Sequence, residues 1–221
     1  HTGVSWPRSG HHLLVRLLQS VLGARFGYCQ HYHTSAACCG QLPCRHPAVH
    51  LSKSHDFDGA LPRDPGRRHL IQWRAFLPSV VSEFELVVRA GGEDSREAFL
   101  SHASHRFGAW LAFQRRWVLW GQEQGQLVLR YEELIADPGA ALARVLKALA
   151  PGRVFDRAHV ARALARVDGE RIEQGRVTSL PGAGVHAPRD IRAFRHYDPA
   201  TFALLARLRH PRESVLPPAG N

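Results

Sequence analysis

Several features that would define a class of protein are missing from this sequence. The 221 residues contain no Met and only two Lys, and no run approaches the roughly 18 apolar residues that a membrane-spanning helix requires. The nucleotide-binding patterns G-x-x-x-x-G-K-[ST] and G-x-G-x-x-G are also absent. No long basic run and no nucleic-acid-binding motif occurs. These absences argue against stable membrane insertion, a standard ATP-binding loop and a nucleic-acid partner.

The composition that remains is basic and apolar enough to fold around a core. Lys and Arg number 29 against 19 Asp and Glu, which gives a net charge of +10, and 44% of the residues are hydrophobic. A positive surplus attracts anionic ligands such as a nucleotide or an acidic glycan. Without repeats or low-complexity segments, the length predicts a single domain over residues 1–221. No signal peptide is recognisable, so we expect a cytoplasmic location unless a signal or anchor precedes this sequence.

The first residues predict a strand, a tight turn and a helix. The apolar run Val4–Trp6 ends at Pro7, and the turn Arg8-Ser9-Gly10 leads into apolar residues at helical spacing up to Leu22. Such a turn directs backbone N–H groups and a helix N-terminus toward a bound anion, and the Arg8 side chain adds positive charge. An ordinary strand-to-helix turn with one surface arginine is the alternative that this segment alone leaves open.

Short apolar strands separated by helices predict an α/β fold. The expected strands cover residues 4–6, 48–53, 69–74 and 126–131, and the expected helices cover 12–22, 78–88, 96–124, 138–149, 156–167 and 201–208. This alternation predicts three α/β/α layers around a central parallel sheet. Ligands of such sheets bind beyond the carboxyl ends of the strands. Polar or cationic groups follow all four predicted strands, at Arg8, at Lys53 to Asp56, at Arg74 and at Arg130 with Tyr131.

Four segments at these strand ends carry a resemblance to a known family. They are Pro7 to Leu13, Lys53-Ser54-His55, the pair Arg74 and Ser82, and Arg130 to Pro138. In this order they resemble the P-K-S-G-T-T-W loop, the K-T-H segment, the R-x7-S spacing and the Y-E-D-L-x-x-D-P segment of sulfotransferases that use 3′-phosphoadenosine-5′-phosphosulfate (PAPS). The resemblance reaches to about residue 150. It implies a P-loop NTPase-like fold, PAPS as donor, the bisphosphate PAP as product, and no metal.

The resemblance also implies a role for each matching residue. His55 corresponds to the general base, and the cations Arg8 and Lys53 offset charge on the leaving phosphate, which completes the catalytic set. The implied donor-binding residues, including an arginine taken for the missing R-K-G segment, are Arg8, Ser9, Gly10, His11, His12, Leu13, Arg74, Ser82, Tyr131 and Arg176.

The sequence departs from the family pattern at the loop. Arg8 stands where the family has Lys, and His11 and His12 stand where it has two Thr. Arginine can hold two oxygens of a phosphate or sulfonate, but its pKa is too high for proton donation. We therefore expect His11, His12 or Lys53 to protonate the leaving group. Asp56, next to His55, is the alternative base.

The expected function is in-line transfer of a sulfuryl group from PAPS to a hydroxyl or amine of a small molecule or a glycan. Such a transfer requires positioned reactants and cations around the phosphosulfate, together with a base for the acceptor proton. Two other classes stay open. One is a nucleotide-dependent kinase on a related fold, which the missing loop lysine disfavours. The other is an inactive module that binds polyanions.

All four cysteines fall in a Cys- and His-rich insert at about residues 28–47. Three interpretations compete, namely a structural zinc site, two local disulfides, and free thiols. The spacing fits no standard C-x2-C zinc pair, and an even number of clustered cysteines in a loop-rich insert slightly favours disulfides, which would staple it. The position of the insert, between the loop and Lys53, predicts that it borders the acceptor site.

Overall fold

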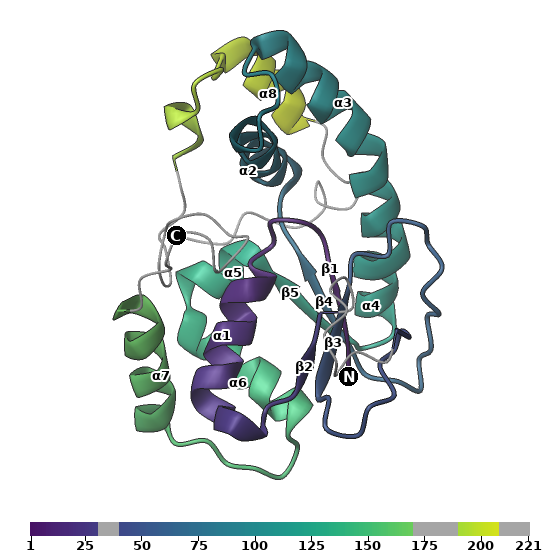
Figure 1. Cartoon of the computed structure of the whole chain (residues 1–221), viewed down its shortest axis with the longest axis vertical. Coiled ribbons are helices and arrows are strands. Elements are labelled where there is room, and N and C mark those ends of the chain that lie inside the picture. Colours follow the sequence, from purple (N-terminus) through teal and green to yellow (C-terminus); the bar gives the residue numbers. More distant parts are fainter. Residues whose placement is uncertain (31–39, 170–189, 208–221) are drawn as a thin grey trace.

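A parallel sheet forms the centre of the molecule (Figure 1). The computed structural model describes residues 1–30, 40–169 and 190–207. The strands of this part are β1 (Thr2–Ser5), β2 (Tyr28–Cys29), β3 (Leu51–Ser54), β4 (His69–Trp73) and β5 (Leu127–Arg130). They form a five-stranded sheet in the order β2-β3-β1-β4-β5, in which all neighbours are parallel. The predicted α/β fold with a central parallel sheet is confirmed.

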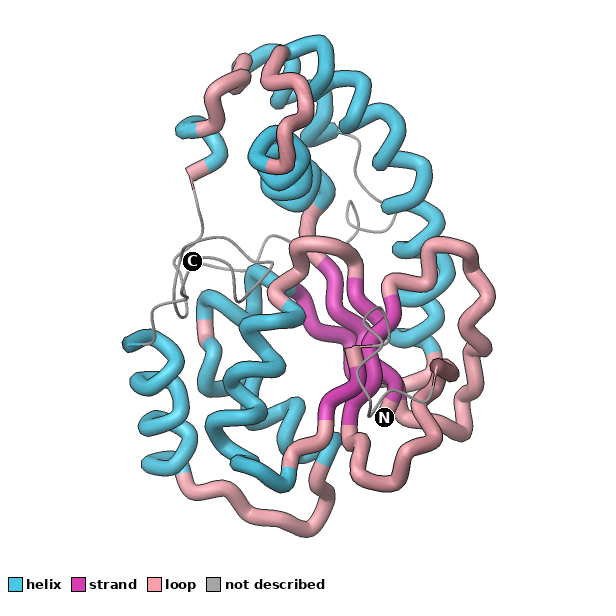
Figure 2. Tube along the Cα trace, viewed as in Figure 1, coloured by secondary structure: helices cyan, strands magenta, loops and turns pink. Residues whose placement is uncertain are grey.

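Helices cover both faces of the sheet, as Figure 2 shows. One face carries α1 (His11–Leu22), α5 (Tyr131–Ala136), α6 (Pro138–Leu149) and α7 (Arg157–Gly169). The other face carries one long helical stretch made of α3 (Arg96–Phe113), the π-helical turn η2 (Gln114–Leu119) and α4 (Trp120–Glu123). Beyond the carboxyl edge lie α2 (Phe76–Arg89) and α8 (Pro199–Arg207), and short 3-10 turns occur at η1 (Gly23–Arg25) and η3 (Ile191–Ala193).

The alternation of side chains along the strands produces two hydrophobic cores. On β4, Leu70 packs with α1, α6 and α7, whereas Ile71 and Trp73 pack with the aromatic side chains of α2 and α3. All residues of β1, β3 and β4 are buried, as expected for central strands of a parallel sheet. The loop after β1 therefore begins in the middle of the carboxyl edge.

Two short elements differ from the sequence-based expectation. Strand β2 lies in the segment expected to be irregular, and its two residues are too few to show a periodicity. The strand expected to end at Tyr131 ends at Arg130, and Tyr131 begins α5. Glu132 and Glu133 then occupy the first turn of α5, where negative charge is favourable.

Candidate functional site

Three neighbouring loops bring most of the predicted site residues to one edge of the sheet. The segment with Arg8 to Gly10 follows β1, His55 follows β3, which contains Lys53, and Arg74 follows β4. Because β1 lies between β3 and β4, the loop after β1 is flanked on both sides by the other two segments. The connections that leave β1 and β4 run to opposite sides of the sheet. Ligands of open α/β sheets bind at such a point, beyond the carboxyl ends of the two strands.

The loop after β1 ends at the N-terminus of α1. Gly10 is the N-cap residue, with a left-handed backbone at φ 79°, and no side chain caps the helix. The first N–H groups of a helix have no acceptor within the helix, so this terminus suits an anion. Ser9 is buried and donates its hydroxyl to the carbonyl of Trp6 at 2.6 Å, which holds the turn together. Arg8 also adopts a left-handed backbone, with φ 62°.

Position 10 requires glycine for two reasons, its left-handed backbone and the closeness of the Tyr131 ring. Both reasons predict that a larger residue destabilises the protein. A Cβ at this position would lie 2.7 Å from Cδ2 of Tyr131. We expect Gly10→Ala to lower the free energy of unfolding by about 3 kcal/mol, from the left-handed backbone and the clash together. Gly125→Ala is the matched control, because Gly125 has φ 61° and open space around a Cβ. Its expected cost is about 1 kcal/mol, from the left-handed backbone alone. Equal losses in urea unfolding would contradict the role of the Tyr131 contact.

Arg8, Arg74 and Ser82 meet on the β4 side of the loop. Arg8 Nε donates to Ser82 Oγ at 2.9 Å, and Arg74 Nη1 donates to the carbonyl of Arg8 at 3.3 Å. Burial and then the charges of Arg74 and Arg89 lower the pKa of Arg8 from its ordinary value. Mutually repelling, partly buried guanidinium groups are stabilised by an anion between or beside them. We call these three residues the arginine cluster.

Tyr131 contacts both the loop and the arginine cluster. The Arg74 guanidinium carbon lies 4.1 Å from the centre of the Tyr131 ring, and the same ring limits the space at Gly10. This position supports the loop from the start of α5. The adenine contact implied by the family resemblance stays a prediction.

Lys53 and His55 lie on the β3 side of the loop. His55 Nδ1 is 2.5 Å from the backbone carbonyl oxygen of Ser5. A carbonyl only accepts hydrogen bonds, so Nδ1 carries the proton and Nε2 is the nitrogen able to accept another. Burial and then the charge of Lys53 lower the pKa of His55 to about 4. The imidazole is therefore neutral at pH 7, as a general base must be.

The Lys53 ammonium is also shifted toward its neutral form. It is buried, its Nζ lies 3.5 Å from Nε2 of His12, and burial followed by the charge of Arg8 lowers its pKa to about 8. A cation that releases its proton near pH 8 is a far better proton donor than arginine. The structure thus places a neutral imidazole and an ammonium with a lowered pKa two residues apart at the same edge of the sheet.

The His11 ring is directed away from the loop. Its Nδ1 lies 2.8 Å from Gln72 Oε1 and its Nε2 lies 3.1 Å from the Tyr28 hydroxyl. Burial and then Lys53 lower its pKa well below the usual value. Gly3 makes room for this ring, because a Cβ there would lie 3.3 Å from His11 Cε1. With both ring nitrogens engaged elsewhere, His11 offers its backbone N–H to an anion in the loop, and of the three expected proton donors His12 and Lys53 remain as candidates.

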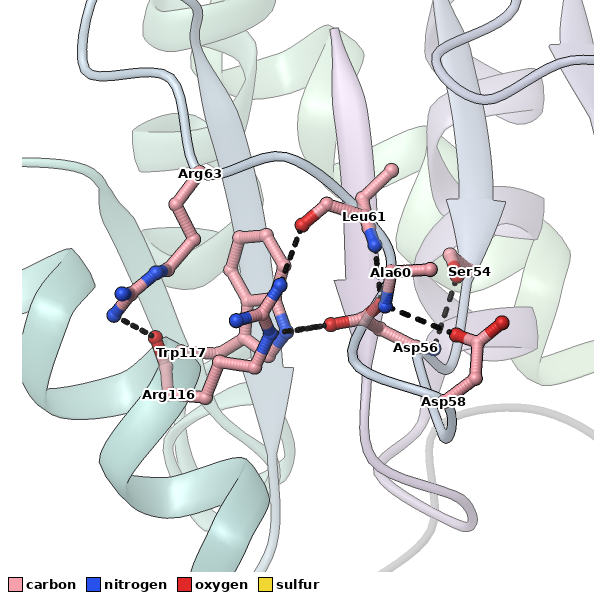
Figure 3. A network of polar contacts seen from close by, with 8 residues as sticks. All are labelled: Ser54, Asp56, Asp58, Ala60, Leu61, Arg63, Arg116 and Trp117. Carbon is pink, nitrogen blue, oxygen red and sulfur yellow. Dashed lines mark hydrogen bonds and ion pairs between the residues drawn. The ribbon is translucent and has the colours of Figure 1, made fainter.

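Asp56 does not act as an alternative base, which corrects the expectation from the sequence. Its Oδ1 accepts from the Leu61 N–H at 2.7 Å, and its Oδ2 accepts from Arg116 Nε at 2.8 Å and Trp117 Nε1 at 2.7 Å (Figure 3). Its side chain is 1% exposed. The π-helical turn η2 presents Arg116 and Trp117 to one carboxylate, and this network fixes the segment that carries His55.

The Asp56 network gives a second stability prediction. An amide at position 56 has a single acceptor oxygen, so either the Leu61 N–H or the Arg116 and Trp117 donors lose their partner. We expect Asp56→Asn to lower the free energy of unfolding by about 2–3 kcal/mol in urea titrations. Asp58→Asn is the matched control, since Asp58 is exposed and an amide oxygen can keep its bond to the Ala60 N–H. Similar losses in both variants would contradict this account.

Part of the predicted site falls outside the described residues. Arg176, Cys38 and Cys39 belong to segments that the structure does not describe. Cys29 is buried at the end of β2, within the sheet and not in an irregular insert, and Cys44 is half-buried. Within residues 1–30, 40–169 and 190–207, no three His, Cys, Asp or Glu side chains gather in a way that could hold a metal ion.

The structure defines the protein at the level of its fold. In the described ranges, no helix combines the length and the apolar character needed to cross a membrane. The described chain is an α/β protein with a cation-rich carboxyl edge. No protein-family model, curated protein or solved structure matches the sequence.

Proposed function

We propose that this protein is a PAPS-dependent sulfotransferase that transfers a sulfuryl group to a hydroxyl of a small molecule or a glycan. One observation carries the proposal: the loop after β1 lies between Lys53 and His55 on one side and Arg74 and Ser82 on the other. A donor with two separated anionic groups needs cations at two places, and the acceptor hydroxyl needs a base only beside the phosphosulfate. We assign the phosphosulfate to the loop and Lys53, and the 3′-phosphate to Arg74 and Ser82.

The same arrangement supports a P-loop NTPase-like reading of the fold, as part of this proposal. The loop follows the central strand β1 and opens directly into α1, with Gly10 as the cap. The backbone N–H groups of His11, His12 and Leu13 then lie at the N-terminus of the helix, where a phosphosulfate would bind. Arg8, Lys53 and these N–H groups supply positive charge, so the proposed reaction needs no metal.

In the proposed reaction, the acceptor oxygen forms a bond to sulfur while the bond from sulfur to the bridging oxygen breaks. The electron pair of the broken bond moves onto the 5′-phosphate of PAP, which is the leaving group. The proton of the acceptor hydroxyl moves to His55 Nε2. Lys53 donates a hydrogen bond or its proton to the leaving oxygen, and Arg8 offsets the charge that develops there.

The pKa values of this site predict the pH dependence of the reaction. The base must be neutral, so kcat/KM rises as the pH increases through the pKa of His55, about 4. The acid must be protonated, so kcat/KM falls as the pH increases through the pKa of Lys53, about 8. We expect a bell-shaped profile with limbs near these values. An alkaline limb at the ordinary pKa of a lysine would contradict the lowered pKa of Lys53, and the absence of any alkaline limb would contradict Lys53 as the proton donor.

The test of the proposed function is a transfer assay with sulfur-labelled PAPS. The acceptors are desulfated glycosaminoglycan oligosaccharides and simple phenols and alcohols. We expect labelled product with at least one acceptor, together with release of PAP. Phosphoryl transfer from ATP with magnesium, without any sulfuryl transfer from PAPS, would contradict the proposal and favour a kinase.

A further inference from the structure

Phe57 is an exposed aromatic side chain beside the proposed base. Phe57 is 59% exposed, whereas the other exposed large hydrophobic residues of the described ranges are aliphatic. Leaving a phenyl ring in water forgoes stabilisation that burial would provide. The ring nevertheless has a defined place, stacked on His55 with 5.3 Å between centroids and edge-on to Trp6 at 6.3 Å. An open ring held against a catalytic imidazole offers a contact surface to a bound molecule.

An ion pair borders the same ring. Arg106 on α3 donates from Nε to Glu83 Oε2 at 3.1 Å, and its Nη2 lies 3.0 Å from Glu83 Oε1. The side chains are 14% and 19% exposed. The guanidinium carbon lies 5.1 Å from the centre of Phe57 and 4.8 Å from that of Trp6. His55 and Arg106 both contact the Phe57 ring, which places the ion pair near the imidazole.

Together these groups match the two kinds of surface on a sugar ring. A pyranose has an apolar C–H face that packs on an aromatic ring, and hydroxyls that bind planar carboxylate and guanidinium groups. A simple phenol gains affinity from an enclosed apolar pocket. Phe57 is open to solvent and has charged neighbours, which favours the sugar.

We propose that Phe57, Glu83 and Arg106 form the acceptor subsite and that the acceptor is a pyranose. The inference rests on the proposed sulfuryl transfer, because His55 defines where the reacting hydroxyl lies. A hydroxyl directed at His55 Nε2 would place its ring against Phe57. The pair of Glu83 and Arg106 would bind neighbouring hydroxyls and select which of them reacts.

The test measures saccharide binding without turnover. A desulfated chondroitin hexasaccharide is titrated into the protein loaded with PAP, and 4-nitrophenol is titrated in parallel. We expect Phe57→Ala to weaken saccharide binding about tenfold, and Phe57→Trp to keep it, because the larger ring preserves the stacking surface. Glu83→Gln keeps the planar shape of the side chain but removes the negative charge of the carboxylate. We expect this change to weaken saccharide binding by about tenfold as well, because hydrogen bonds to a charged group are the stronger ones. Leu204→Ala, at an exposed apolar residue of α8, is the control without effect.

The outcomes separate this inference from the proposed function. Unchanged saccharide binding by Phe57→Ala, or no saccharide binding by the wild-type protein, overturns the subsite. Loss of 4-nitrophenol binding alone in Phe57→Ala also overturns it and assigns the surface to phenols. If PAP fails to bind while the saccharide pattern holds, the sulfotransferase proposal is contradicted and the sugar subsite stands.

Discussion

Replacement of His55 by Ala is expected to lower kcat for sulfuryl transfer by about a thousandfold, the usual effect of removing a general base. Affinity for 3′,5′-adenosine bisphosphate is expected to stay within about twofold, because the loop and the arginine cluster are intact. The reason lies in the geometry. The Ser5 carbonyl fixes the proton on Nδ1, and the lowered pKa of about 4 keeps Nε2 available as the base.

His105→Ala is the control for this experiment. His105 is exposed on α3, so its loss removes an imidazole without touching the site. Turnover is measured with labelled PAPS, and bisphosphate affinity by calorimetry. Wild-type turnover in His55→Ala would move the base elsewhere. The buried network around Asp56 excludes that carboxylate, so His12 would be examined next.

Replacement of Arg8 by Ala is expected to weaken bisphosphate binding about 100-fold. Arg8 is partly buried and hydrogen-bonds Ser82, so its guanidinium is already positioned toward the arginine cluster. Loss of a positioned, charge-assisted hydrogen bond to phosphate costs about 1.5–3 kcal/mol, and the loss of the loop's charge adds to this. Arg8→Lys is expected to recover much of the affinity, because an ammonium keeps the positive charge. The recovery stays incomplete, because lysine cannot contact two phosphate oxygens at once as arginine does.

Arg144→Ala separates the local effect from the change in net charge. Arg144 is an exposed residue of α6 that pairs with Glu133, so the variant removes one positive charge outside the site. Its bisphosphate affinity should match that of the wild-type protein. If Arg8→Ala and Arg144→Ala weaken binding equally, the loop arginine acts only through the overall charge of +10, and its assigned role is contradicted.

Much of the fold could be predicted because its elements are local patterns. The apolar runs at β1, β3, β4 and β5 and the helical periodicity of α1 and α6 are visible in the sequence, and both helices begin and end within one residue of the expected positions. Strand β2 could not be predicted in this way. Its two residues form a strand only because β3 lies beside them.

The site was only partly predictable, because side-chain direction depends on packing. The position of Lys53 and His55 at a strand end follows from the sequence. The direction of the His11 ring does not, since it depends on the space at Gly3 and on partners from β2 and β4. The Asp56 network depends on a π-helical turn sixty residues away. For the acceptor side the sequence pointed to the Cys- and His-rich insert, whereas Phe57, an aromatic residue two positions after His55 in a polar segment, was not recognised as a signal.

The most direct test of the central claim is a calorimetric titration of the wild-type protein with 3′,5′-adenosine bisphosphate and, separately, with ATP and magnesium. We predict one bisphosphate bound per chain, with affinity that decreases in Arg8→Ala and with no magnesium requirement. Tight binding of ATP with magnesium, and none of the bisphosphate, would contradict the assignment of the loop and the arginine cluster to PAPS.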